Sequence, residues 1–330
     1  IHWPLSGYFP LLVFVPATLR QIHDWCRIQW NSRVAGIVIA SVPVIGFTGT
    51  LIALLGIGSQ AYQLPLQALL GTGVLSNKMA GWKQFTDYTG AVIDAEFEGD
   101  SPVIITDNYY TAAQTEFSGL TTAGFTLDQD KAVRDGRLSQ YRLWRLDASG
   151  LAGEIGKSAL FITEDSTLTI PGKHDVLDRV CQLSTELKYL GELSLFSGDK
   201  RFSYYKVDRL LDIRNRADYR AYPCPFPATA WIDFPLAKAE ISGLISISGW
   251  AYNEDIGVDE VHLILDDQTL ATARYGVSRP DVVEAMVVMT DPNAPNLGFE
   301  LELDSRSWTN GSHQFAIEIL NKQGITLRYG

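Results

Sequence analysis

The chain has 330 residues, with 38 acidic side chains against 27 basic ones and a formal net charge of −11. This acidic excess argues against nucleic-acid binding, because nucleic-acid phosphates are neutralised by Lys and Arg. The excess is confined to residues 79–330, which hold 37 acidic and 23 basic side chains, whereas residues 1–78 are slightly basic. We therefore expect no nucleic acid among the partners.

The chain opens with an apolar run at residues 4–19. Sixteen residues are short for a membrane span, which needs about 20. Because the sequence begins with Ile1 inside apolar sequence, we expect it to be the C-terminal part of a longer protein and this run to be a truncated transmembrane helix. The alternative is the core of a signal peptide, but its basic residues should precede the run, and here they follow it.

A second apolar run, residues 34–58, is long enough to cross a bilayer. The segment between the two runs, residues 20–33, carries Arg20, Arg27 and Arg33. Short loops that are rich in Lys and Arg remain cytoplasmic. We therefore expect a cytoplasmic loop at 20–33, an interfacial connector at 59–78 and an extracytoplasmic location for everything that follows.

Residues 79–222 alternate between helical and strand patterns. Apolar side chains recur at helical spacing over 80–97, 108–120 and 175–189, whereas 103–105 and 158–163 are short apolar runs typical of buried strands. Helices that alternate with buried strands indicate a small three-layer α/β domain. No glycine-rich phosphate loop follows any of the strands.

The last third of the chain changes character. Four prolines between Pro223 and Pro235 indicate a semi-rigid linker over residues 223–239. Residues 240–330 then hold short alternating stretches separated by turn residues, without a helical period, which is typical of an immunoglobulin-like β-sandwich. The expected fold class is a multidomain membrane protein with two N-terminal transmembrane helices, a small α/β domain and a C-terminal sandwich.

Three cysteines are present. Cys26 lies in the expected cytoplasmic loop and should be reduced, whereas Cys181 and Cys224 lie in the expected extracytoplasmic part, where oxidation is possible. A disulfide bond between Cys181 and Cys224 and two separately buried thiols are both compatible with the sequence.

No short motif defines a catalytic or metal centre. The five histidines are scattered without metal-ligand spacing, so we expect no metal site. Asp128-Gln129-Asp130 has the form that many soluble sugar transferases use to hold a metal–nucleotide complex. Such tripeptides arise easily by chance in an acidic protein, and we interpret this one as a solvated loop.

Four stretches taken in order resemble a known family. They are Ile1-His2-Trp3-Pro4, Gly81-Trp82, Asp107-Asn108-Tyr109 and Gln140-Tyr141-Arg142-Leu143-Trp144. Over about residues 1–215 the chain resembles the C-terminal part of bacterial integral-membrane glycosyltransferases of the protein mannosyltransferase and aminoarabinose transferase type (family 39). Arg142 stands where members usually have Asp. Residues 240–330 look like an immunoglobulin-like module that is appended to bacterial surface proteins and to some of these transferases.

The resemblance implies transfer of a sugar from a polyprenyl-phosphate donor to a glycan, lipid or protein acceptor at the outer face of the bacterial cytoplasmic membrane. The family's acidic catalytic residues lie in an N-terminal loop that this chain lacks. We therefore expect no catalytic residue and no cofactor here, and no activity of this part alone; a divalent metal in the complete protein stays open. The alternative is a membrane-anchored binding or adhesion protein without catalysis.

The substrate-binding candidates form two groups. His2 and Trp3 lie at the expected extracytoplasmic end of the first span, where an imidazole can contact phosphate and an indole can stack on a sugar; the alternative is a pair that anchors a helix end at the interface. The second group lies in the α/β part, after the first strand pattern and before the second. Its members either form a surface for the sugar or the acceptor, or stabilise the α/β core. Its members are Asp107, Tyr109, Gln140, Tyr141 and Trp144.

Overall fold

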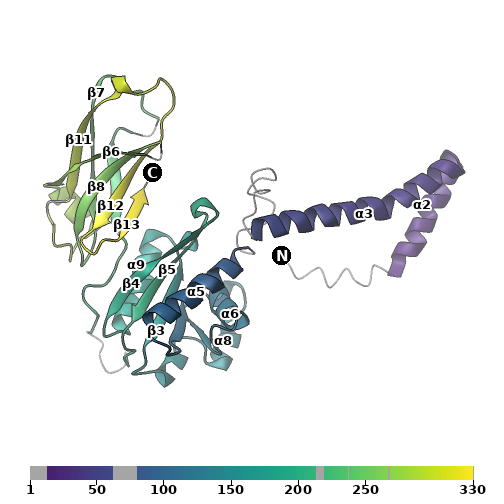
Figure 1. Ribbon diagram of the computed structural model, residues 1–330, viewed down its shortest axis with the longest axis horizontal. Helices are drawn as coiled ribbons and strands as arrows, with labels where there is room; N and C mark the ends of the chain where they lie inside the picture. The colour runs from purple at the N-terminus through teal and green to yellow at the C-terminus, as the bar shows by residue number, and fades with distance from the viewer. Residues whose placement is uncertain (1–12, 62–79, 213–218, 237, 267, 330) are drawn as a thin grey trace. The chain divides into compact units, whose positions relative to one another are not determined.

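The structure is a computed structural model that describes residues 13–61, 80–212, 219–236, 238–266 and 268–329. It contains both helices and several β-sheets (Figure 1). Two compact units divide the chain, residues 1–83 and residues 84–330. Each unit is described below by itself.

The N-terminal unit contains one long apolar helix, α3, Ser32–Ala61. Its part Ser32–Ser59 is long and apolar enough to cross a membrane, and its most apolar 18-residue stretch is not buried inside the protein. Such a helix near an N-terminus suits a membrane anchor or a signal sequence. Pro43 lies inside the helix, which membrane helices tolerate. Within the described residues no second helix meets these criteria.

A second helix, α2, spans Val15–Gln29 and packs against α3. Residues 20–29, which the arginine content predicts as a loop, are therefore helical, and only a short turn at Trp30 and Asn31 separates α2 from α3. Arg, Gln, Leu and Ile all have good or moderate helix propensity, so the charged segment continues the helix instead of breaking it. Most of the run at 4–19, and most of the connector at 59–78, lie outside the described residues.

The first part of the C-terminal unit is built on a five-stranded sheet in the order β2-β1-β3-β5-β4. The strands β1, β2 and β3 are parallel, whereas β5 and β4 continue the sheet in antiparallel fashion. Their bounds are Val103–Thr106 for β1, Gly124–Thr126 for β2, Ala159–Glu164 for β3, Leu187–Leu195 for β4 and Lys200–Val207 for β5. The side chains of β1 and β3 are buried without exception, as in a sheet covered on both faces.

Helices cover both faces of this sheet. On one face, Phe85 of α5 (Trp82–Glu96) packs against the ring of Phe202 with 4.7 Å between ring centroids. On the other face, Leu177 of α9 (Ile170–Gln182) joins a buried cluster with Phe161 and Tyr205. Helix α6 (Tyr109–Phe117) connects β1 to β2. A Cβ atom on Gly124 would lie 2.6 Å from the carbonyl oxygen of Ala112, so only glycine permits this close approach of α6 to β2.

The α9 helix differs from the helix expected at 175–189. It begins after Thr169, whose side chain accepts a hydrogen bond from the Gly172 N–H, and it ends at Gln182. An N-cap of this kind followed by proline in the first turn fixes a helix start. Residues 187–189 belong to β4 and pair with β5. Their backbone groups bond to a neighbouring strand, and the local helical period of the sequence does not reveal such a partner.

The second part of the unit is a β-sandwich of two four-stranded antiparallel sheets, β10-β11-β7-β6 and β13-β12-β8-β9. Side chains from both sheets, among them Ile247, Phe299, Val261 and Ile317, share one buried cluster. The strand bounds are Thr229–Phe234 (β6), Leu244–Tyr252 (β7), Val258–Leu265 (β8), Gln268–Thr272 (β9), Arg274–Val277 (β10), Gly298–Asp304 (β11), Phe315–Asn321 (β12) and Thr326–Tyr329 (β13).

The proline-rich segment 223–239 is not a free linker. Cys224 and Phe226 are buried in the same cluster as the α/β sheet, and β6 pairs with β7 inside the sandwich. Burial of these side chains offsets the stiffness that the prolines confer. A short helix, α10 (Pro280–Met286), also interrupts the sandwich sequence, where no helix is expected.

Candidate functional site

Polar side chains gather where the parallel strands of the α/β sheet end. Asp107 and Asn108 follow β1, Asp128 follows β2, and Glu164 and Asp165 end β3. The chain passes from β1 through α6 to β2 on one side and returns to β3 on the other, so the connections diverge between β1 and β3. Open α/β sheets bind ligands at such a divergence, outside the carboxyl ends of the strands.

The Asp107 carboxyl is held by the backbone. Its Oδ1 atom accepts hydrogen bonds from the Glu164 N–H at 3.0 Å and from the side-chain amide of Asn108 at 2.9 Å. Among the described residues, its Oδ2 atom has no hydrogen-bond partner. Burial, opposed in part by the hydrogen bond from Glu164, raises the pKa of the Asp107 carboxyl to about 7. This carboxyl can therefore exchange a proton near neutral pH.

Glu164 and Lys200 are a second buried acid–base set. Glu164 is 2 % exposed and Lys200 only 1 %. Burial lowers the pKa of the Lys200 ammonium to about 8, and the charge of Glu164 opposes the shift. The Lys200 ammonium also lies 5.5 Å from the centre of the Phe202 ring. A carboxyl and a lysine with displaced pKa values, Asp107 and Lys200, are a candidate site on electrostatic grounds.

A third acid–base set lies beside them. The Lys173 ammonium of α9 lies 2.7 Å from Asp165 Oδ2 and 3.1 Å from the Ser203 hydroxyl, and the Ser203 hydroxyl donates to the same carboxylate oxygen at 2.5 Å. Both charged side chains are largely buried. The three groups satisfy one another, which is the arrangement that a buried ion pair requires.

Two of the polar residues at the strand ends act as helix caps. Asn108 accepts a hydrogen bond from the Thr111 N–H at 2.8 Å and starts α6. Asp128 accepts from the Lys131 N–H at 2.9 Å and precedes α7, Asp130–Arg134. The tripeptide Asp128-Gln129-Asp130 is thus no fully solvated loop, because Asp128 is buried.

The other predicted residues form a row of aromatic rings along α6 and α8 (Leu138–Trp144). The Tyr141 ring lies 6.2 Å from the Tyr109 ring and 6.2 Å from the Trp144 ring, between centroids. The Tyr141 hydroxyl donates to the Tyr109 carbonyl oxygen at 2.7 Å, and burial raises the pKa of this hydroxyl to about 12. Gln140 is exposed on the same helix.

The structure therefore separates the predicted site residues into two environments. Tyr109, Tyr141 and Trp144 meet in one row, although 32 residues of sequence separate the first two. Asp107 instead lies buried at the end of β1. His2 and Trp3 lie outside the described residues.

Sequence reasoning missed the side chains that share the strand edge with Asp107. Glu164 and Asp165 stand directly after an apolar strand, and that position was a signal for a polar strand end. Lys173 and Lys200 carried no such signal, because their burial depends on pairing with residues that are distant in sequence. In the parts of the chain that the structure describes, no three His, Cys, Asp or Glu residues are placed to hold a metal ion.

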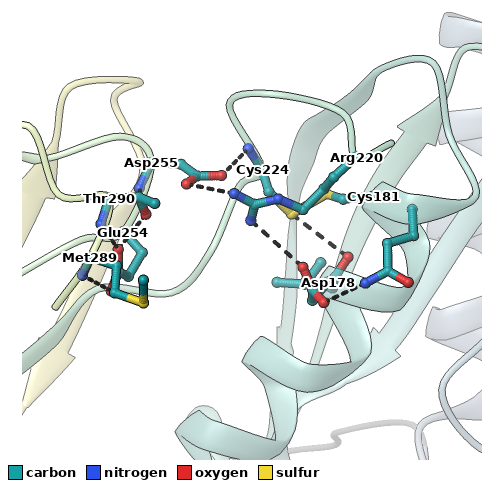
Figure 2. A network of polar contacts seen from close by, with 10 residues as sticks. Asp178, Cys181, Arg220, Cys224, Glu254, Asp255, Met289 and Thr290 are labelled. Carbon is teal, nitrogen blue, oxygen red and sulfur yellow. Dashed lines mark hydrogen bonds and ion pairs between the residues drawn. A yellow bond between two sulfur atoms is a disulfide. The ribbon is translucent and has the colours of Figure 1, made fainter. Parts of the chain in front are cut away.

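A second network joins the α/β part to the sandwich (Figure 2). A disulfide bond links Cys181 of α9 to Cys224, the pairing that the sequence left open. The Arg220 guanidinium lies 3.0 Å from Asp255 of the sandwich and 3.6 Å from Asp178 of α9. The Cys224 N–H also donates to Asp255, at 3.0 Å. One buried sandwich carboxylate thus accepts hydrogen bonds from two residues next to the disulfide.

The chain matches no known protein family, and no curated protein is significantly similar to it.

Proposed function

We propose that this chain is the C-terminal region of a membrane glycosyltransferase that moves a sugar from a polyprenyl-phosphate donor to an extracytoplasmic acceptor. The observation that carries the proposal is the convergence of two separate motif stretches. Asp107-Asn108-Tyr109 and Gln140 to Trp144 meet through the bond from the Tyr141 hydroxyl to the Tyr109 carbonyl oxygen. Motifs that resemble one family in sequence order thereby share one location.

The helix α3 supports membrane attachment, because it is apolar over the length of a span and has Arg33 at its start. With Arg20 and Arg27 in α2, the basic flank favours a cytoplasmic N-terminal side. The disulfide bond in the later part is compatible with an oxidising, extracytoplasmic compartment. These two features support a membrane helix at α3 in a bacterial cytoplasmic membrane, with the α/β part and an immunoglobulin-like sandwich outside; the other proposed helix, at residues 4–19, lies mostly outside the described residues.

Within this proposal Tyr109, the partly buried ring at one end of the aromatic row, provides the surface for the sugar or the acceptor. Aromatic rings offer large, rigid contact faces to apolar faces of ligands, and the phenol of Tyr109 adds a polar edge. Tyr109 is only partly buried, and its hydroxyl donates to Asp135 at 2.9 Å. The buried polar cluster below Tyr109 holds the strand ends that position this ring.

The proposal is tested in membranes that contain the complete protein, with polyprenyl-phosphate hexoses that carry radiolabelled sugars as donors. Tyr109→Ala should reduce the transfer rate roughly tenfold, because it removes one aromatic contact. His2→Ala should also reduce transfer. The matched control is Tyr222→Ala, another partly accessible tyrosine, which is 69 % exposed and distant in sequence from the row.

Two results would count against the proposal. Absence of transfer from every polyprenyl-phosphate hexose by the complete wild-type protein would contradict the transferase. Equal rates for Tyr109→Ala and Tyr222→Ala would remove the aromatic row from the substrate surface.

Alkaline phosphatase fused after residue 266 should be active and a fusion after residue 30 inactive; the reverse would contradict the orientation.

A membrane-anchored binding or adhesion protein is the second candidate. The mutual pairing of Asp165, Lys173 and Ser203 favours it, because these buried polar groups satisfy one another and leave little capacity for a reacting group. Several further spans and an acidic pair upstream would favour the enzyme. A complete protein with only two spans would favour the binding protein.

A further inference from the structure

One segment of the α/β part is basic, although the part of the chain that contains it is acidic. Residues 131–145 contain five basic side chains and one acidic side chain, whereas residues 79–330 as a whole carry a clear acidic excess. The basic side chains are Lys131, Arg134, Arg137, Arg142 and Arg145. Helix α8 and all of α7 except its first residue, Asp130, fall within this segment. We call residues 131–145 the basic segment.

The basic segment also exposes large apolar side chains. Leu143 is 80 % exposed, Val133 60 % and Trp144 54 %. In a soluble surface helix these positions are normally polar, and exposed apolar groups that lie among charges mark interaction sites. Among the residues that the structure describes, neither Arg142 nor Arg145 forms an ion pair, so their charges are available to a partner of opposite sign.

The fold fixes this presentation. Tyr141, on the inner side of α8, is buried, and its hydroxyl bonds to the Tyr109 carbonyl oxygen. After Arg145, which has a left-handed backbone conformation, the chain returns inward and the Leu146 carbonyl accepts from the Thr126 N–H at 2.9 Å. A Cβ atom on Gly150 would lie 1.7 Å from the Arg145 carbonyl oxygen, so glycine is required there. Leu143 and Trp144 therefore remain on the outside.

We propose that the basic segment is a membrane-contact surface, in which Leu143 and Trp144 enter the interfacial region of a bilayer and Arg142 and Arg145 contact anionic lipid headgroups. The inference goes beyond sugar transfer, and it rests only on the membrane attachment in the proposed function. Basic residues that accompany exposed Trp and Leu on a helix are the composition of interfacial segments, and Trp is favoured at the headgroup level.

Covalent connection brings this surface to a membrane. The apolar helix α3 ends at Ala61 and α5 begins at Trp82, so a short segment joins the α/β part to the membrane helix. Anionic lipids then attract the basic segment, whereas they repel the remaining exterior, which is acidic. Each Lys or Arg near an anionic surface contributes attraction equivalent to roughly a fivefold change in binding, which salt screens within about 10 Å.

The experiment uses the full chain with Cys26→Ala, so that an introduced cysteine is the single free thiol. A nitroxide is attached at Leu143→Cys or, as the control, at Met289→Cys, which is 83 % exposed in the sandwich. The chain is reconstituted into vesicles of phosphatidylcholine or of phosphatidylcholine mixed with phosphatidylglycerol. Power-saturation electron paramagnetic resonance then compares the collisions of each label with oxygen and with a water-soluble nickel chelate.

In the anionic vesicles the label at position 143 should be shielded from the nickel chelate and accessible to oxygen, whereas the label at 289 should stay in water. Arg142→Gln together with Arg145→Gln should lower the ratio of bound to free segment on the order of 30-fold. Arg328→Gln, a change of one basic residue in the sandwich, should leave it unchanged. Added salt should weaken the contact in the same direction.

Three results would contradict the proposed membrane-contact surface. One is equal exposure of both labels to the nickel chelate in anionic vesicles, and another is equal shielding in neutral and anionic vesicles. The third is shielding that persists in zwitterionic detergent without lipid, which would identify a protein partner or a second copy. A chain that alkaline carbonate extracts from the vesicles would instead contradict the membrane attachment in the proposed function. Circular dichroism checks that the variants fold.

Discussion

An ion pair at the strand ends of the α/β sheet and an ion pair on a sandwich sheet differ in how far they are buried. At the strand ends of the α/β sheet, Asp165 and Lys173 pair with side chains that are 7 % and 15 % exposed. In the sandwich, Arg274 and Glu300 pair across neighbouring strands with 72 % and 45 % exposure. A charge in a buried pair is stabilised by its partner, because water does not reach it, whereas a charge in an exposed pair is also stabilised by water. Removal of one partner should therefore cost more free energy of unfolding in the buried pair than in the exposed pair.

The difference follows from the two sheet architectures. Helices on both faces of the α/β sheet remove its strands from water, so polar residues at the strand ends must satisfy one another. Each sandwich sheet buries one face only, and alternation places its charged residues on the other face, as the burial pattern of β11 illustrates.

Lys173→Met should have the largest effect, because it leaves the Asp165 carboxylate buried without its cation. We expect a loss of about 3–5 kcal/mol in the free energy of unfolding. The measurement is urea denaturation of the full chain in detergent micelles, with hydrogen exchange of β4 and β5 amides to place the loss in the α/β part.

Arg274→Met in the sandwich is the matched control, and its loss should stay below about 1 kcal/mol. Comparable losses for the two variants would contradict the distinction between the parts. The double variant Lys173→Met with Asp165→Asn should recover part of the stability, because no buried charge is then left alone.

The disulfide bond should have the next largest effect. Cys181 and Cys224 are 43 residues apart, and opening a loop of that length costs about 2–4 kcal/mol by releasing the unfolded chain. Cys181→Ser with Cys224→Ser should also loosen the contact of Arg220 with Asp255, since Cys224 contributes to the same carboxylate. Hydrogen exchange should therefore increase in β4, β5 and the residues around Asp255.

Cys26→Ser is the control for thiol removal, because this cysteine forms no disulfide. Reduction of the wild-type chain should reproduce the double variant. Unchanged exchange around Asp255 after reduction would show that the bonds of Arg220 and the Cys224 N–H to Asp255 do not depend on the disulfide.

The sequence predicted the parts of this fold that local patterns encode. Apolar runs marked β1 and β3, and period-two alternation marked most of the sandwich strands. β6 was missed because the prolines of residues 223–239 indicate a linker, and only the pairing of Trp231 with Trp250 across the strands reveals a strand. The start of α9 was missed because Thr169 and Pro171 act through capping, outside the apolar period.

The candidate site was less predictable, for a physical reason. Asp107 and Tyr109 were singled out because residues 107–109 resemble a family motif that follows a strand, a signal carried by a short stretch of sequence. Lys200 was not identified, because its burial depends on the fold around β5, and that burial is what lowers the pKa of its ammonium. Long-range electrostatics of this kind leave no pattern in a single sequence.

Asp107 should make the stability of the α/β part depend on pH near neutrality. Its folded-state pKa of about 7 lies above its ordinary value of 3.8, so the folded state holds a proton that the unfolded state loses first. This contribution is complete below about pH 4 and is lost as the pH rises to 7, with a slope of at most about 1.4 kcal/mol per pH unit. Asp107→Asn should flatten the thermal stability profile between pH 4 and 7 relative to the wild type; an unchanged slope would contradict the assignment.

Asp304 in the sandwich should show the smallest effect, and one of opposite sign. Hydrogen bonds from the Arg306 side chain and backbone lower the pKa of its carboxyl to about 2, below the ordinary 3.8. The resulting contribution is present above about pH 4 and is lost as the pH falls through 2. Because both side chains are exposed, solvent screens the pair and the change should be small. Asp304→Asn should therefore be slightly less stable than the wild type at pH 7 and should converge with it as the pH falls through 2, by thermal unfolding. A loss at pH 7 as large as that of Lys173→Met would mean that exposed pairs in the sandwich are as important to stability as the buried pairs at the strand ends.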